Sequence, residues 1–162
     1  MSSMRLHPHD GIKWWTEAAE GAGLSGDRRG EGAALGNLGA AYAALGETAK
    51  AIDCHGQALV IAREIGDRRG EGAALCNLGN AYVGLGETAK AIDYHGQALV
   101  ISREIGDRRS EGNALANLGA AYKILDRGAE ARDAWVAALA IFEAIGDPNA
   151  TRVREWLARL AD

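Results

Sequence analysis

Six polar residues recur at a fixed spacing of 40 residues and could together bind a peptide. They are the asparagines Asn37, Asn77 and Asn117 and the arginines Arg29, Arg69 and Arg109. An asparagine amide both donates and accepts hydrogen bonds, so it can pair with the backbone of an extended peptide regardless of the peptide's side chains. An arginine guanidinium is a forked donor suited to carboxylates. The chemistry that this pattern favours is therefore binding.

Two structural roles compete with this interpretation. An asparagine inside a helix can bond to the neighbouring helix and only hold the repeats together. Arg29 could instead form a surface ion pair with Glu31, which would contribute less than about 1 kcal/mol. The preceding residue, Arg28, is expected on the packed side of its helix and is left out of the candidate site.

The other reactive side chains fit no catalytic or metal site. His55 and His95 occupy one repeat position, but successive repeats place such positions about 10 Å or more apart, so we expect satisfied core histidines. Cys54 and Cys76 could pair, although two reduced thiols are the simpler interpretation. The glycines of 26–32 lack the preceding strand and the following Lys-Ser/Thr of a phosphate loop. We predict no catalytic residue, no metal site, no cofactor and no enzyme activity.

The chain is an internal repeat. Residues 26–65 and 66–105 are identical at 34 of 40 positions, and residues 106–145 match the second copy at 21 of 40. The segment 11–25 aligns with the second half of a repeat, and 146–162 with the first half. A period of this size indicates a solenoid or a propeller.

Periodicity favours the helical solenoid. Each repeat has two segments of about 18 residues with apolar residues at helical spacing, such as Leu35, Leu38 and Tyr42. Asp residues after Gly, as at Asp27, suit a helix that ends at a glycine and a next helix that begins with an N-cap. Glycines within the first helices, such as Gly39, indicate a close approach between helices. One buried column should hold Trp15, His55, His95 and Trp135.

We therefore expect one all-α solenoid of about eight antiparallel helices over residues 11–162. It comprises a half-repeat at 11–25, full repeats at 26–65, 66–105 and 106–145, and a capping helix at 146–162. Residues 1–10 are expected to be a flexible tail.

The residues Asn37-Leu38-Gly39-Ala-Ala-Tyr42, followed by Ala51 and Ala58, resemble the tetratricopeptide repeat, and the motif recurs in the next two units. The 40-residue unit is similar to the longer-helix subclass of Pins-type adaptors, kinesin light chains and many bacterial regulators. His55 and His95 stand where the family usually has an aromatic residue, and Gly-Asp replaces its proline. The resemblance implies a right-handed superhelix whose concave groove, lined by first helices, binds peptides or proteins without catalysis.

Helical geometry adds three residues to the candidate groove face. Opposite the buried face lie Asn80 in the second repeat and Asn113 and Lys123 in the third. The predicted groove residues are Arg29, Asn37, Arg69, Asn77, Asn80, Arg109, Asn113, Asn117 and Lys123. Four of the six differences between the first two repeats (36, 40, 43 and 44) fall on this face. Near-copies that differ mainly on one exposed face indicate that this face meets a non-repetitive partner.

The leading functional hypothesis is a cytoplasmic protein-interaction scaffold that binds an extended segment, acidic or with a free C-terminal carboxylate. The alternatives are a self-associating repeat array and a piece of a larger bacterial regulator. A net charge of −4 argues against nucleic acid, and no apolar run approaches a membrane span. Arginine outnumbers lysine 14 to 4, which favours a bacterial source.

Overall fold

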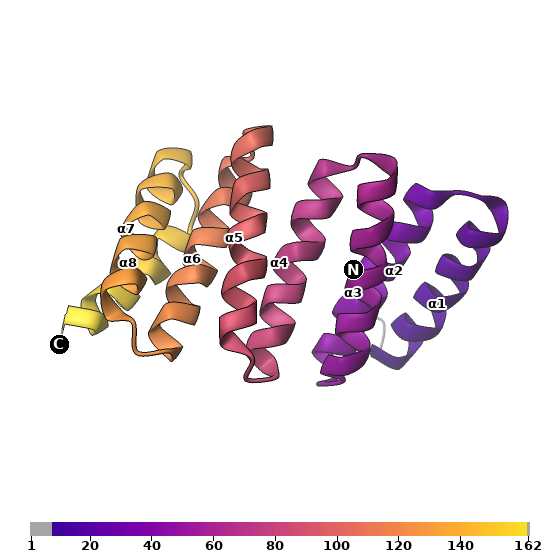
Figure 1. The fold of residues 1–162 in the computed structure, drawn as a ribbon, viewed down its shortest axis with the longest axis horizontal. Coiled ribbons are helices and arrows are strands. Elements are labelled where there is room, and N and C mark those ends of the chain that lie inside the picture. The colour runs from indigo at the N-terminus through magenta and orange to yellow at the C-terminus, as the bar shows by residue number, and fades with distance from the viewer. Residues whose placement is uncertain (1–7, 162) are drawn as a thin grey trace, which may run out of the picture. The chain divides into compact units, whose positions relative to one another are not determined.

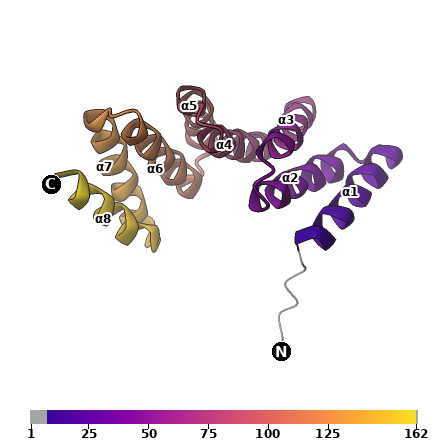
Figure 2. The ribbon, with the colours of Figure 1, turned by 90° about the horizontal axis from the view of Figure 1, so that it is seen from below.

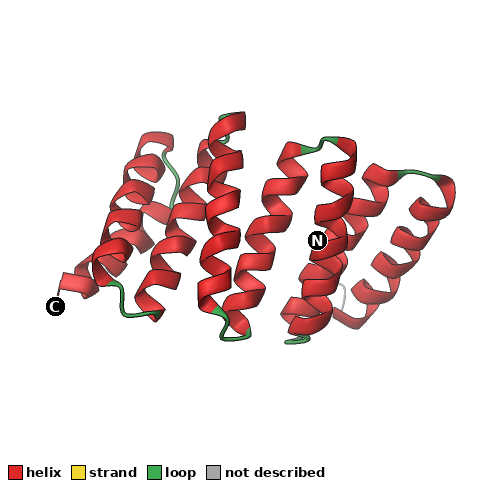
Figure 3. Ribbon diagram, in the orientation of Figure 1, coloured by secondary structure: helices red, strands yellow, loops and turns green. Residues whose placement is uncertain are grey.

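The structure is built from helices joined by short loops. The computed structural model describes residues 8–161, in which every regular element is an α-helix (Figure 1, Figure 3). The eight helices of this range are α1 (Pro8–Ser25), α2 (Arg28–Ala44), α3 (Thr48–Ile65), α4 (Arg68–Gly84), α5 (Thr88–Ile105), α6 (Arg108–Ile124), α7 (Gly128–Ile145) and α8 (Asn149–Ala161). The all-α class expected from the sequence is confirmed for these residues.

The helix ends follow the predicted signals. Gly66, Gly106 and Gly146 end α3, α5 and α7 with φ of 68°, 69° and 66°, a left-handed conformation that a side chain would strain. The aspartate that follows such a glycine caps the N-terminus of the next helix. At the start of α2, for example, the Asp27 carboxylate accepts a hydrogen bond from the Gly30 amide at 2.9 Å. Helix α1 begins at Pro8, inside the expected tail of residues 1–10; residues 1–7 of that tail lie outside the described range.

The helices group into two compact units, Met1–Ala81 and Tyr82–Asp162, and the boundary falls inside α4. In unit 1, α1 packs against α2 and α2 against α3; in unit 2, α5 packs against α6, α6 against α7 and α7 against α8. Within each unit, consecutive helices run in opposite directions and lie side by side (Figure 1, Figure 2). The sequence does not mark this division, because the repeat continues through it.

Two helix glycines, Gly39 and Gly119, are required by aromatic rings of the next helix. A Cβ on Gly39 would lie 2.6 Å from Cε1 of His55, and a Cβ on Gly119 would lie 2.3 Å from Cδ1 of Trp135. The close approach predicted from these glycines is therefore a ring of the second helix against the backbone of the first. Of the predicted buried column, His55, His95 and Trp135 are buried, and Trp15 is half-buried.

The two units differ in the size of their core side chains. The core of unit 2 contains Trp135, Phe142 and Val153, and Trp156 packs on Trp135 with ring centroids 5.4 Å apart. The core of unit 1 includes a smaller cluster around Leu35, Ala58 and Ile61. Because the helix frame repeats while the side chains shrink, unit 1 has unfilled space where unit 2 is packed.

Candidate functional site

A pocket of about 390 Å³ opens between the first helices of unit 1. Helices α2 and α4 supply its walls, and α3 and the loop before α4 supply its floor. The lining residues are Arg29, Gly32, Ala33, Gly36, Asn37, Ala40, His55, Ala58, Ile61, Ala62, Ile65, Asp67, Gly70, Ala73, Ala74 and Asn77. Most of the lining positions on α2 and α4 belong to the helix face that the sequence predicted to be open, whereas Gly32, Gly70 and Ala74 do not.

The pocket exists because its walls carry almost no side-chain volume. Apart from Arg29, Asn37 and Asn77, every wall residue on α2 and α4 is glycine or alanine. Because the wall side chains are this small, residues of α3 at the floor, such as Ile61 and Ile65, are in contact with the pocket. Sequence reasoning assigned the groove to first helices alone and missed this floor, although the small residues of α2 and α4 were the available signal.

The two wall asparagines have free amides. The Asn37 and Asn77 side chains make no hydrogen bond to any other group in residues 8–161. Asn37 is exposed and Asn77 is half-buried. The alternative that these asparagines only tie neighbouring helices together is therefore not supported in unit 1. Each amide offers donors and an acceptor to a ligand between α2 and α4.

The charged groups of the pocket are Arg29 and Asp67. The Asp67 carboxylate accepts a hydrogen bond from the Gly70 amide at 3.0 Å, as the N-cap of α4. Arg29 is exposed and forms no ion pair within the part of the chain that the structure describes. The expected pairing of Arg29 with Glu31 is absent there, because Glu31 binds Arg28. The guanidinium of Arg29 is therefore available to a ligand carboxylate.

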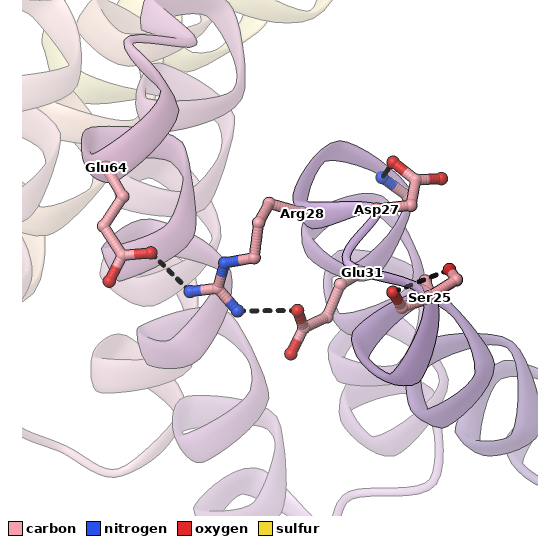
Figure 4. Close-up of polar contacts among 7 residues, drawn as sticks. Ser25, Asp27, Arg28, Glu31 and Glu64 are labelled. Atoms are coloured by element: carbon pink, nitrogen blue, oxygen red, sulfur yellow. Dashed lines mark hydrogen bonds and ion pairs between the residues drawn. The ribbon is translucent and has the colours of Figure 1, made fainter.

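Arg28 has the structural role that the sequence suggested. It donates to Glu31 at 2.6 Å and to Glu64, so it links the start of α2 to the end of α3 (Figure 4). The equivalent Glu71 of α4 accepts from Arg63 at 2.9 Å and from Arg68 at 2.7 Å. Burial raises the pKa of the Glu71 carboxyl, but the hydrogen bonds from the two arginines outweigh burial and hold the pKa below its usual value.

His55 forms the polar part of the floor. Only 2% of the residue is exposed, and its Nδ1 is buried without a hydrogen-bond partner. Burial lowers the pKa of the imidazole, so the ring is neutral near pH 7. The sequence predicted a core histidine whose ring nitrogens are hydrogen-bonded. The buried position is correct, but the predicted hydrogen bonding is wrong for Nδ1. His95 is also buried with both ring nitrogens unpartnered, and burial lowers its pKa to about 4.

A family model for the tetratricopeptide repeat matches residues 10–104, which is more than half of the chain. The chain belongs to the tetratricopeptide-repeat family. The resemblance inferred from the sequence is confirmed, and the signature positions Leu38, Ala51 and Ala58 are buried as that repeat requires. A comparison with curated proteins gives no match.

Solved structures similar to this chain share the repeat fold. BtubC (BKLC) from P. vanneervenii superposes with a TM-score of 0.81 at 22% identity, over 96% of this chain and 66% of that one. A Rap protein complexed with competence and sporulation factor superposes with a TM-score of 0.80 at 20% identity, over 92% of this chain and 42% of that one. The nearly identical TPR-like repeats of a putative kinesin light chain from Podosopora anserina superpose with a TM-score of 0.67 at 17% identity, over 95% of this chain and 86% of that one. The chain spans less than two thirds of the first two proteins. The α-solenoid class is confirmed by these likenesses.

The tetratricopeptide pocket of unit 1 contains only some of the predicted groove residues. Arg29, Asn37 and Asn77 line it, whereas Arg69 and Asn80 are exposed outside its lining. Both are on α4 with Asn77, but neither is among the residues that line the pocket.

The groove residues predicted in unit 2 have other surroundings. Nε of Arg109 pairs with Oδ2 of the buried Asp147 at 3.0 Å, and the Lys123 ammonium lies 6.0 Å from the ring centroid of Trp135. Asn113 and Asn117 are half-buried. In unit 2 the Arg109 side chain is therefore held in an ion pair with the Asp147 carboxylate.

The remaining predicted features concern thiols, metals and membranes. Cys54 is buried and Cys76 is half-buried, and the two form no disulfide. Within residues 8–161, no group of three or more His, Cys, Asp or Glu side chains could hold a metal ion. None of the helices in that same range combines the length and apolar character needed to cross a membrane.

Proposed function

We propose that this tetratricopeptide chain is a non-catalytic interaction module that holds an extended segment of a partner protein in the pocket of unit 1. The observation that carries the proposal is the pair of free amides, Asn37 and Asn77, on the two walls of one pocket. Backbone pairing by such amides does not depend on the ligand sequence, which suits an extended peptide. The small wall residues leave room for that peptide.

Arg29 supports a preference for acidic segments or a free C-terminal carboxylate. It is the only positively charged residue in the pocket lining, and Asp67 already accepts a hydrogen bond from the backbone of α4. We place the module in the cytoplasm, in keeping with two free thiols. Because the chain spans less than two thirds of several similar proteins, a role as part of a larger bacterial regulator fits the same site.

The test is selection of binders from a library of random linear peptides on the immobilised protein. Selected peptides should bind the wild type and lose about tenfold or more in affinity to the double variant Asn37→Ala/Asn77→Ala, which removes both amides. Asn80→Ala is the matched control, because it is the same change on α4 outside the pocket. Circular dichroism confirms that each variant is folded. Peptides that bind the double variant as well as the wild type would refute the proposal.

A second candidate function, self-association, is favoured by the surface of α1. Trp14 is 56% exposed and Leu24 is 91% exposed, although both are large apolar side chains. Exposed apolar groups of this kind favour association. Light scattering of the wild type and of Trp14→Ser/Leu24→Ser tests it. A mass that stays monomeric at every concentration would reject this candidate.

A further inference from the structure

We propose that the pocket of unit 1 binds one aromatic side chain of the partner segment, with a carboxylate beside it held by Arg29. This inference rests on the proposed binding of an extended segment and specifies its chemistry. The argument comes from the chain itself, because unit 2 repeats the same three-helix frame 80 residues later and contains the groups that unit 1 lacks.

The repeat relates each pocket residue to a position in unit 2. His55 corresponds to Trp135, and Ala62 corresponds to Phe142. On the last helix, Ala73 corresponds to Val153, and Asn77 to Leu157. Each of these four positions is larger or more apolar in unit 2. The four unit 2 side chains pack together in one cluster, in which Phe142 and Val153 are each 1% exposed.

Unit 2 therefore shows what this frame accommodates when it is filled. Two aromatic rings and two aliphatic side chains stand in unit 2 at the positions where unit 1 has a histidine, two alanines and an asparagine. The pocket volume of about 390 Å³ has room for one large ring and the adjacent backbone of a ligand. Aromatic side chains bury more apolar area than any other kind, so they gain most from such a space.

The charges follow the same relation. In unit 2, Arg109 pairs with the buried carboxylate of Asp147 at 3.0 Å. In unit 1, the corresponding Arg29 and Asp67 both line the pocket but form no ion pair with each other in the described structure. Arg29 is therefore a pocket charge that has no counter-ion within residues 8–161, and its complementary group is a carboxylate on the ligand.

The buried histidine independently indicates a ligand. His55 is 98% buried at the pocket floor and has an unpartnered Nδ1, which is an unfavourable arrangement without compensation. Trp135, which holds the same position in unit 2, is satisfied by a hydrogen bond from Nε1 to the Ala116 carbonyl at 3.0 Å. The floor formed around Trp135 in unit 2 is thus filled and satisfied, and the floor of unit 1 is neither.

The test uses a small probe that does not depend on the partner: N-acetyltryptophan, which carries an indole, an amide and a carboxylate. Nuclear magnetic resonance of the labelled protein should show saturable shifts at the side-chain amides of Asn37 and Asn77, with millimolar affinity. N-acetylalanine should give no saturable shift. N-acetyltryptophanamide, which lacks the carboxylate, should bind about threefold to tenfold more weakly. In Arg29→Gln the acid and the amide should bind equally.

Filling the pocket with residues from unit 2 provides the decisive variants. Ala73→Val and Ala62→Phe copy Val153 and Phe142 and should each weaken N-acetyltryptophan by about tenfold or more. Ala73 is on an exposed wall, so Ala73→Val keeps the test valid if Ala62→Phe fails to fold. Ala43→Val is the matched control, because it copies Val83 of the second repeat and lies on α2 outside the pocket lining.

The outcomes separate this inference from the proposed function. Peptides that depend on Asn37 and Asn77 but bind equally to Ala73→Val would refute the aromatic site and leave the module intact. Binding of N-acetyltryptophan without any selected peptide would support the aromatic site and refute the extended-segment function. Equal shifts with N-acetylalanine would overturn the inference. So would concentration-dependent shifts of the pocket residues without a probe, which would assign the pocket to a second copy of the chain.

Discussion

The buried histidine of α5 predicts how the stability of the protein depends on pH. Burial lowers the pKa of His95 from its ordinary 6.5 to about 4, because the charged imidazolium would lose its water without gaining a partner. The unfolded chain binds a proton near pH 6.5, whereas the folded chain remains neutral until about pH 4. Stability from this residue is therefore complete above pH 6.5 and is lost as the pH falls toward 4.

The size of the effect follows from the two pKa values. Between pH 7 and pH 5, protonation of His95 in the unfolded chain alone lowers the free energy of unfolding by about 2 kcal/mol. His55 adds to the loss in the same direction, since burial lowers its pKa too. His95→Leu removes the His95 contribution. It also removes two unpartnered ring nitrogens, so the variant should be at least as stable as the wild type at pH 7.

Urea unfolding followed by circular dichroism at pH 7 and pH 5 measures the difference. The wild type should lose about 2 kcal/mol more than His95→Leu over this interval. His9→Leu is the matched control, because it makes the same substitution at an exposed histidine of α1 and leaves the buried His95 in place. An equal pH dependence in the wild type and in His95→Leu would refute the reasoning.

Three further predictions concern packing, an ion-pair cluster and a helix cap. Gly39→Ala should lower the free energy of unfolding by about 1–3 kcal/mol, because the new methyl group meets the His55 ring. Gly36→Ala should raise it by about 0.5–1 kcal/mol, because nothing lies within 4 Å of the new methyl group. Thermal unfolding compares the two variants, and equal shifts of the melting temperature would contradict the prediction. Glu71→Gln should cost about 1–2 kcal/mol in urea unfolding, since two arginines lose their charged acceptor. Asp27→Ala should cost about 1 kcal/mol and speed amide exchange in the first turn of α2; unchanged exchange would argue against the cap.

The sequence was sufficient for the features that depend on local signals. Helix ends at Gly66 and Gly106 and the aspartate caps followed from short-range rules, and the structure confirms them. The family followed from the spacing of a few small and aromatic residues. These features are predictable because each is decided within about one helical turn.

The sequence was not sufficient to say where the groove is open. Helical geometry predicts a face for each first helix, but whether a hollow forms there depends on side chains from three helices at once. Arg29 and Arg109 occupy the same repeat position, yet Arg109 reaches a carboxylate 38 residues away while Arg29 reaches no counter-ion within residues 8–161. A column drawn through all repeats treats the two positions as equal, although their surroundings differ.

The composition of the pocket walls also determines how binding would divide between enthalpy and entropy. Glycine and alanine have no side-chain rotamers, so a ligand that covers Gly36, Ala40 and Ala73 freezes no rotamer in the protein. The ordering penalty would then come almost entirely from the ligand and from the few polar side chains. A partner segment that is already stiff, for example through a proline next to its anchor, would gain affinity without any added contact.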